Sequence, residues 1–248
     1  MQLRRIVLLA LLLLPMWVSG QGLRILFWGD SITDGGWGRS GGSMASAEER
    51  NQSDPNHLYG HSYMFIAASE LESRHPEQGY QCFNRGISGY TLRDLTARWK
   101  KDVEALRPDV LSILVGTNDV ARHLQKEPHT QFDIEAWEAE YRALLRRARE
   151  LNPAVKIMLG TPFVAPTGRL AATSDYAERE QLIAACSESV RRLANEFDAV
   201  VVDYEALFAQ LMARYEVEGT HWIWDGIHPT AAGHHRMADL WLKAFRKR

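Results

Sequence analysis

The sequence predicts an α/β protein built around a parallel β-sheet. Five short apolar runs, each flanked by Gly, Pro, Asn or Asp, alternate with longer segments of helical period, as the strands and helices of a parallel sheet do. The runs are almost continuously apolar, which is typical of strands that are buried on both faces. The chain shows no internal repeat and no interdomain linker, so residues 21–248 are expected to form a single domain.

The predicted elements follow one another in regular alternation. The expected strands lie at residues 23–28, 80–84, 110–115, 155–160 and 199–203. The expected helices lie at residues 63–73, 92–106, 134–151, 178–197 and 231–245, where apolar side chains recur at helical spacing. Thr91, with Asp94 three residues later, resembles a capping box that would begin the second of these helices.

Composition excludes several classes of protein. The 248 residues contain 29 Lys and Arg against 31 Asp and Glu, and 46% of them are hydrophobic. This is an ordinary globular composition, which excludes disordered, collagen-like and disulfide-scaffold chains. A charge balance this close to neutral is not that of a nucleic-acid-binding protein, and we expect no nucleic-acid partner.

The first 20 residues have the pattern of a cleavable secretory signal peptide. Arg4 and Arg5 precede an apolar run over residues 6–18, and small residues follow before Gln21. The run is shorter than the roughly 20 residues that span a bilayer, so a retained membrane anchor is the weaker alternative. We expect cleavage near Gly20, no stable membrane insertion afterwards, and a secreted or periplasmic protein.

Residues suited to ester hydrolysis follow the predicted strands. In open parallel sheets, ligands bind beyond the carboxyl ends of the strands. The first three runs are followed by GDSI (29–32), NRGISG (84–89) and GTND (116–119), and DGIHP (225–229) lies near the C-terminus. A serine hydrolase needs a hydroxyl, a base, a carboxylate that orients the base, and donors for the oxyanion. These segments contain all four kinds of group.

In this order, the four segments resemble the signature blocks of the SGNH (GDSL-type) hydrolase family. The resemblance implies a three-layer α/β/α, flavodoxin-like fold with a five-stranded parallel sheet in the order 2-1-3-4-5. It also implies serine esterase chemistry through an acyl-enzyme, without a metal or an organic cofactor. Carried over position by position, Ser31 is the nucleophile, His228 the base and Asp225 its orienting carboxylate. Ser31, Gly89 and Asn118 would form the oxyanion hole.

These residue types also suit the roles on physical grounds. Ser31, directly after a strand, can expose its hydroxyl and offer its own backbone N–H. Gly89 allows close approach of the backbone to a substrate, and Asn118 has a side-chain N–H₂ that can point at a developing negative charge. Asp225 and His228 are three residues apart, close enough for the carboxylate to select one tautomer of the imidazole.

Neighbouring residues are expected to have structural or substrate-binding roles. Asp30 and Asp34 are expected to hold the turn around the serine through backbone hydrogen bonds, and Asp119 is expected to be structural. Trp37 and Trp224 are the candidate substrate contacts, because aromatic rings near the site can stack on sugar rings or complete the core. Trp37 lies in a polar loop, residues 35–60, which is too long for an ordinary connection between a strand and a helix.

The sequence predicts neither a metal site nor a nucleotide cofactor. The other histidines lack metal-binding spacing such as H-E-x-x-H. Gly36, Gly38 and Gly41 have the G-x-G-x-x-G spacing, but they come too far after the strand and no helix follows them, so a dinucleotide site is rejected. The implied strand order places Cys82 and Cys186 far apart, and no disulfide is expected.

Further similarity narrows the expected substrate. The segments TLRDL (91–95) and TPF (161–163) resemble the carbohydrate-acetylesterase branch of the family, notably the bacterial acetylxylan esterases. The resemblance implies an O-acetylesterase that acts on a small-molecule or polysaccharide ester. The loop at 35–60 departs from that branch in length and composition, and its few large apolar residues argue mildly against long acyl chains. The alternatives are a broad-specificity lipase, lysophospholipase or thioesterase with the same machinery, and a non-catalytic binding protein, which the complete set of site residues disfavours.

Overall fold

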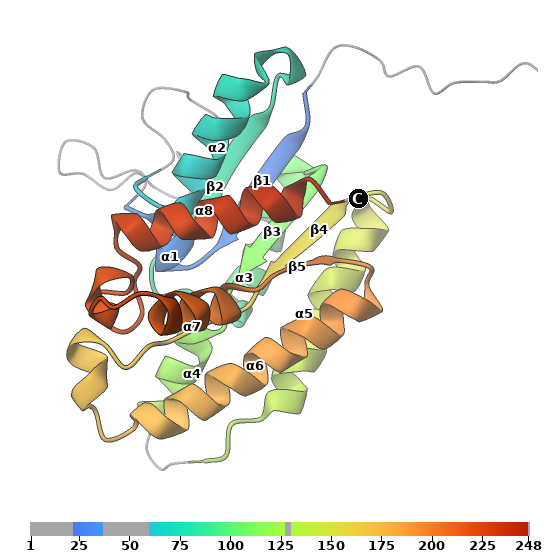
Figure 1. Ribbon diagram of the computed structural model, residues 1–248. Helices are drawn as coiled ribbons and strands as arrows, with labels where there is room; N and C mark the ends of the chain where they lie inside the picture. The colour runs from blue at the N-terminus through green and yellow to red at the C-terminus, as the bar shows by residue number, and fades with distance from the viewer. Residues whose placement is uncertain (1–21, 37–59, 127–129, 248) are drawn as a thin grey trace, which may run out of the picture.

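The fold is a three-layer α/β/α sandwich around a parallel sheet. The computed structural model describes residues 22–36, 60–126 and 130–247. The sheet has five strands in the spatial order β2-β1-β3-β4-β5 (Figure 1): β1 (Arg24–Gly29), β2 (Gln81–Gly86), β3 (Val110–Leu114), β4 (Lys156–Gly160) and β5 (Val200–Val202). The predicted strands, their order and the fold class are therefore confirmed. The predicted signal peptide and Trp37 lie outside the described residues.

Helices cover both faces of the sheet (Figure 1). One core lies under α2 (Tyr63–Arg74), α7 (Tyr204–Arg214) and α8 (Ala231–Phe245). The other lies under α3 (Leu92–Ala97), α4 (Thr117–Leu124), α5 (Ile134–Leu151) and α6 (Tyr176–Glu196). The short elements are α1 (Ser31–Asp34), η3 (Pro76–Gln78), η4 (Lys100–Glu104), η5 (Gly168–Ala172) and η6 (Gly219–His221).

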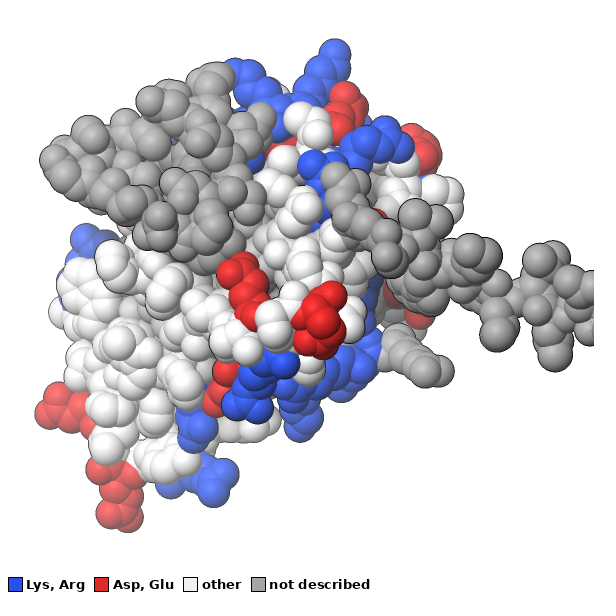
Figure 2. Space-filling view, turned by 90° about the horizontal axis from the view of Figure 1, so that it is seen from above, with Lys and Arg blue, Asp and Glu red and all other residues white. Residues whose placement is uncertain are grey.

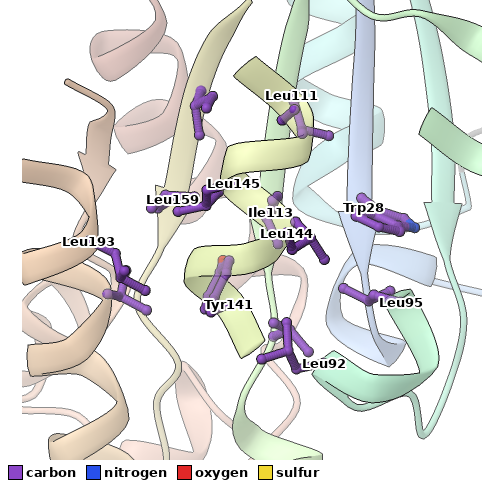
Figure 3. Close-up of a cluster of buried hydrophobic side chains, with 14 of the residues drawn as sticks. Trp28, Leu92, Leu95, Leu111, Ile113, Tyr141, Leu144, Leu145, Leu159 and Leu193 are labelled. Carbon is purple, nitrogen blue, oxygen red and sulfur yellow. The ribbon is translucent and has the colours of Figure 1, made fainter. Parts of the chain in front are cut away.

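Side chains of each strand alternate between the two cores. On β1, Phe27 belongs to the core under α8, whereas its neighbour Trp28 belongs to the core under α5. In the second core, Tyr141 and Leu144 of α5 lie over Ile113 of β3 (Figure 3). Because both faces are buried, β1, β3 and β4 consist of nearly continuous apolar runs rather than alternating ones.

The strands end level with one another, which positions the site. Gly29 at the end of β1 pairs with Gly86 of β2 and with Leu114 of β3. Leu114 pairs in turn with Gly160 of β4, which pairs with Val202 of β5. The polar segments that follow the first three strands therefore lie close together at the carboxyl ends of the strands.

The helix predicted over residues 92–106 is divided in the structure into α3 and a π-helical turn. Helix α3 begins with the predicted capping box, in which Thr91 Oγ1 accepts from Asp94 N and Asp94 Oδ2 accepts from Thr91 N. It ends at Ala97, and the π-helical turn η4 follows. In this wider turn Asp102 is buried, and it accepts hydrogen bonds from Arg98 Nε (2.8 Å) and Arg98 Nη2 (2.7 Å). The change of helical pitch thus accompanies an ion pair between Arg98 and a buried carboxylate.

Two helices, α4 and α7, lie where the sequence pattern predicted no element. Helix α7 has clear local signals in retrospect, because Asp203 caps it by accepting from Ala206 N at 3.1 Å. Its buried residues Tyr204, Phe208 and Leu211 recur at steps of four and three, which places them on one helical face.

The two cysteines are free and lie on opposite sides of the sheet. Cys82 is on the edge strand β2 and belongs to the core under α2, whereas Cys186 is on α6 and belongs to the other core. The prediction that they form no disulfide is confirmed.

The surface carries charges of both signs. On the face shown in Figure 2, basic and acidic side chains lie next to one another around a broad uncharged area. In the part of the chain that the structure describes, no helix combines the length and the apolar character needed to cross a bilayer.

Candidate active site

Ser31, His228 and Asp225 form a continuous hydrogen-bonded chain. Ser31 Oγ lies 2.9 Å from His228 Nε2, and His228 Nδ1 lies 2.9 Å from Asp225 Oδ2. Ser31 begins α1 directly after β1, and the other two residues belong to the loop that precedes α8. Asp225 is buried, whereas the His228 side chain is 31% exposed. In this geometry the imidazole can accept the serine proton while the carboxylate holds its other nitrogen.

Hydrogen bonds keep Asp225 in its charged form. Asp225 Oδ1 accepts from the backbone N–H groups of Ile227 (3.0 Å) and His228 (2.8 Å). Burial alone would raise the pKa of this carboxyl, but the bonds from the backbone and side chain of His228 and from the Ile227 N–H bring the pKa below its usual value. The carboxylate favours the His228 tautomer protonated at Nδ1, which leaves Nε2 free to accept a proton from Ser31.

Two aspartates hold the turn that carries Ser31, in different ways. Asp30 caps α1, and its Oδ1 accepts from Ile32 N at 2.9 Å. This confirms the predicted role of Asp30. Asp34 instead accepts from the backbone N–H (3.2 Å) and hydroxyl (3.1 Å) of Ser88, so through these bonds it ties α1 to the loop after β2.

The predicted oxyanion donors lie on segments that are joined by hydrogen bonds. Asn118 Nδ2 donates to Asp30 Oδ2 (3.3 Å), next to Ser31, and to Tyr90 O (3.1 Å), next to Gly89. Among the described residues, no acceptor bonds the backbone N–H of Ser31 or of Gly89. Gly89 has a φ of 81°, which glycine adopts without strain. Two backbone donors are therefore available to a ligand, while the Asn118 amide is shared with protein acceptors.

Two carboxyl groups beside these donors have raised pKa values. Asp119 accepts from Leu92 N (3.1 Å) at the start of α3, which confirms its structural role. Burial is the main cause that raises the pKa of Asp30 to about 7 and that of Asp119 to about 6, and the negative charge of Asp119 adds to the effect on Asp30. Asp30 therefore titrates near neutral pH.

The raised pKa of Asp30 predicts that stability decreases as the pH rises. The folded protein retains the Asp30 proton up to about pH 7, whereas the unfolded chain releases it near the ordinary aspartate pKa of 3.8. Between these values the folded state binds more protons than the unfolded state. The contribution of Asp30 to stability is therefore complete below about pH 4, and it is lost as the pH approaches 7.

We expect the thermal midpoint of Asp30→Asn to depend less on pH than that of the wild type between about pH 4 and 7. Asn keeps the capping oxygen but does not titrate. Asp119, with its pKa raised to about 6, and His234, with its pKa lowered to about 4, still titrate in the variant and change stability in opposite directions. Thermal unfolding of both proteins at several pH values between about 4 and 8 measures the difference. A variant whose midpoint varies with pH as the wild type does would contradict the raised pKa.

Trp224 exposes its ring beside His228. Trp224 is 57% exposed, and its ring stacks on the imidazole with centroids 6.3 Å apart and an interplanar angle of 28°. Trp28 and Trp222, which also flank the site in the sequence, are buried in the cores. Trp224 is thus placed to contact a molecule bound at Ser31.

The sequence pattern missed two residues that hold the site together. Asn84 Nδ2 donates to Thr33 O (3.1 Å) and Asp34 O (3.2 Å), so it joins the end of β2 to α1. Its place at the head of the NRGISG segment was the available signal. Arg169 Nη2 donates to Asp225 Oδ2 at 3.2 Å, and an arginine in a polar stretch gives no such signal.

Comparison with known proteins places the chain in a family. A model of the GDSL-like lipase/acylhydrolase family matches residues 27–236. An acetylxylan esterase from Geobacillus stearothermophilus is 34% identical over 230 residues, which cover 90% of this chain and 94% of that protein. A crystal structure of an acetylxylan esterase from the same organism has a TM-score of 0.74 at 31% identity, covering 93% of this chain and 97% of the other.

A second solved structure agrees with this assignment. A Parabacteroides merdae protein named a GDSL-like lipase has a TM-score of 0.78 at 31% identity, covering 90% of this chain and 95% of the other. The segment matched by the family model contains Ser31, Asp225 and His228. The chain therefore belongs to the GDSL-like lipase/acylhydrolase family and is an enzyme that hydrolyses ester bonds.

Proposed function

We propose that the protein is an exported carbohydrate O-acetylesterase that acts through Ser31, His228 and Asp225. The hydrogen-bonded chain of these three side chains is the observation that carries the proposal. The similarity to an acetylxylan esterase over 90% of the chain supports an acetylated carbohydrate as substrate. The signal-peptide pattern of residues 1–20 supports export, because polysaccharides are met outside the cell.

The first half of the proposed reaction transfers the acetyl group to Ser31. His228 Nε2 takes the hydroxyl proton as Ser31 Oγ attacks the acetyl carbonyl carbon, and Asp225 stabilises the imidazolium that forms. The backbone N–H groups of Ser31 and Gly89 and the Asn118 amide stabilise the oxyanion of the tetrahedral intermediate. When the intermediate collapses, the sugar oxygen leaves with the proton from His228, and the acetyl group remains on Ser31.

The second half releases acetate. His228 takes a proton from a water molecule, whose oxygen attacks the acetyl carbon of the acyl-enzyme. The same donors stabilise the second oxyanion, and Ser31 Oγ then leaves and recovers its proton from His228. Water is the only co-substrate that this sequence of steps requires.

Replacing Asn118 by alanine should lower kcat by about 10²–10³-fold with a much smaller change in KM. The donor acts on charge that develops in the transition state, so its loss does not weaken substrate binding to the same extent. In the free protein the longer of its two bonds is to Asp30 Oδ2 at 3.3 Å, and a substrate oxygen would compete for this one. Steady-state kinetics with p-nitrophenyl acetate measures the effect.

Asn152→Ala is the matched control for this prediction. Its amide donates to Pro108 O at the other end of the strands, where β3 and β4 begin. We expect this variant to keep the wild-type kcat. An Asn118→Ala enzyme that changed only KM would contradict the proposed oxyanion role.

The exposed ring of Trp224 supports a sugar as the alcohol part of the ester. An aromatic face beside His228 offers a sugar ring a flat apolar surface next to the reacting groups. The same catalytic groups would also serve a lipase, lysophospholipase or thioesterase of broad specificity. The length of the acyl chain separates these activities.

The proposal is tested by two assays run in parallel. One measures acetate released from acetylated xylan and from other acetylated glycans, and the other measures hydrolysis of p-nitrophenyl esters of increasing acyl length. Ser31→Ala is the control for both. We expect release from a glycan and a sharp preference for acetyl esters. Activity restricted to longer acyl chains would retain the three catalytic residues but reject the carbohydrate substrate.

A further inference from the structure

An exposed arginine is bound to the buried carboxylate of the site. Arg169 Nη2 lies 3.2 Å from Asp225 Oδ2, the same oxygen that accepts from His228 Nδ1 at 2.9 Å. The Arg169 side chain is 72% exposed, whereas that of Asp225 is 2% exposed. One carboxylate oxygen is therefore shared between the imidazole and a cation that faces solvent.

The fold builds this contact through the residues just before Arg169. Thr167 Oγ1 donates to Ile223 O at 2.7 Å, which joins the start of η5 to the loop before α8. Gly168 has a φ of 54°, and a Cβ at this position would lie 2.2 Å from Trp224 O. The two segments are thus in direct backbone contact, and no larger residue fits at Gly168 without displacing them. This contact holds the Arg169 backbone beside Asp225.

We propose that Arg169 is a positioning residue of the esterase, which holds Asp225 against His228 and uses its charge to keep the imidazole neutral at lower pH. The inference rests on the proposed roles of His228 and Asp225. Asp225 attracts a proton to His228, and a cation that shares the same oxygen weakens this attraction. Because only the neutral imidazole can act as the base, Arg169 extends activity toward acid pH.

The other titratable groups near His228 do not supply this effect. His234 on α8 is close enough to interact with His228, but burial, with added repulsion from His228, lowers its pKa to about 4. His234 is therefore mostly neutral above about pH 4. Asp30, the N-cap of α1, bonds to Ile32 and Asn118, and Asp34 bonds to Ser88. Asp30, whose pKa is about 7, is present in the wild type and in every Arg169 variant, so a difference between their acid limbs does not come from it. Among the described residues, two basic side chains contact Asp225, namely those of His228 and Arg169.

Two substitutions separate the charge of Arg169 from its hydrogen bond. Arg169→Gln keeps a donor and removes the charge, whereas Arg169→Lys keeps the charge. The measurement is kcat/KM for p-nitrophenyl acetate against pH at low ionic strength. We expect the acid limb of the Gln variant to move up by about half a pH unit, a modest shift because solvent screens an exposed guanidinium. The Lys variant should keep the wild-type limb, and added salt should move the wild type toward the Gln variant.

Arg74→Gln is the matched control. Arg74 has a similar exposure, 64%, and pairs with Glu70, but it lies at the end of α2 that leads to η3 and β2, far along the chain from the loop of His228. Its acid limb should be that of the wild type. An unchanged acid limb in Arg169→Gln would overturn the proposal, whatever the activity of the variant at its optimum pH.

Failure of this inference is distinguishable from failure of the proposed function. If Ser31→Ala is inactive and Arg169→Gln has the wild-type profile, only the role of Arg169 is wrong. If Ser31→Ala retains full activity, the catalytic assignment fails, and the pH profile no longer reports on His228.

Discussion

Replacing Ser31 by alanine is expected to lower kcat by at least about 10³-fold while the protein remains folded. The hydroxyl is the proposed nucleophile, and no other group of the site can replace it in forming an acyl-enzyme. In the structure, this hydroxyl is hydrogen-bonded to His228 Nε2. The cost in stability should therefore be about 1 kcal/mol or less. Residual hydrolysis above the rate in water would come from the oxyanion donors and from binding.

Hydrolysis of p-nitrophenyl acetate and a thermal melt of the same samples measure both parts of this result. Ser73→Ala is the matched control, because its hydroxyl donates to Glu70 O on the exposed part of α2. This control should keep both activity and melting temperature. A Ser31→Ala protein with more than about a tenth of the wild-type activity would contradict the assignment, because the expected residual activity is far lower.

The second large effect is expected on stability. Asp102→Ala should lower the free energy of unfolding by about 3–5 kcal/mol, because it removes a buried carboxylate that pairs with Arg85 and Arg98. Asp102 accepts from Trp28 Nε1 at 3.0 Å and from Arg98, and it lies 3.6 Å from Arg85 Nε. The side chains of Asp102 and Arg85 are fully buried. A loss of this size is a large part of the 5–15 kcal/mol that is typical of a domain.

Urea unfolding measures this change, with Asp239→Ala as the control. Asp239 is 54% exposed and lies 3.9 Å from Arg236, so its removal should change the free energy of unfolding by less than about 0.5 kcal/mol. Equal stabilities of the two variants would show that the buried cluster contributes no more than a surface pair.

The sequence predicted those features that depend on local patterns. The strands were found because both faces of the sheet are buried, which leaves continuous apolar runs such as ILFW in β1. Helix α8 was predicted with its observed bounds, 231–245, and Thr230 caps it by accepting from Gly233 N. Ser31 and His228 could be proposed from the sequence because chemically distinctive residues follow strand ends or form a recognisable segment, and the structure places their side chains in contact although 197 residues separate them.

Features that depend on distant contacts were not predictable in this way. The π-helical turn η4 contains Asp102, which accepts a hydrogen bond from Trp28, 74 residues away in the sequence. No local sequence pattern predicts that partner. Arg169 meets Asp225 across 56 residues, and only the docking of η5 on the loop before α8 shows the contact. Helix α7 is a different case, because its cap and its apolar spacing were present in the sequence.

Covalent labelling offers the sharpest test of Ser31 as the nucleophile. The protein is treated with diethyl p-nitrophenyl phosphate, and the loss of activity is followed beside peptide mapping by mass spectrometry. We expect one adduct, on the peptide that contains Ser31, in proportion to the activity lost, and much slower labelling of His228→Ala, which lacks the base. Complete inactivation with Ser31 unmodified, or an adduct on another residue that accounts for the loss, would contradict the proposed mechanism.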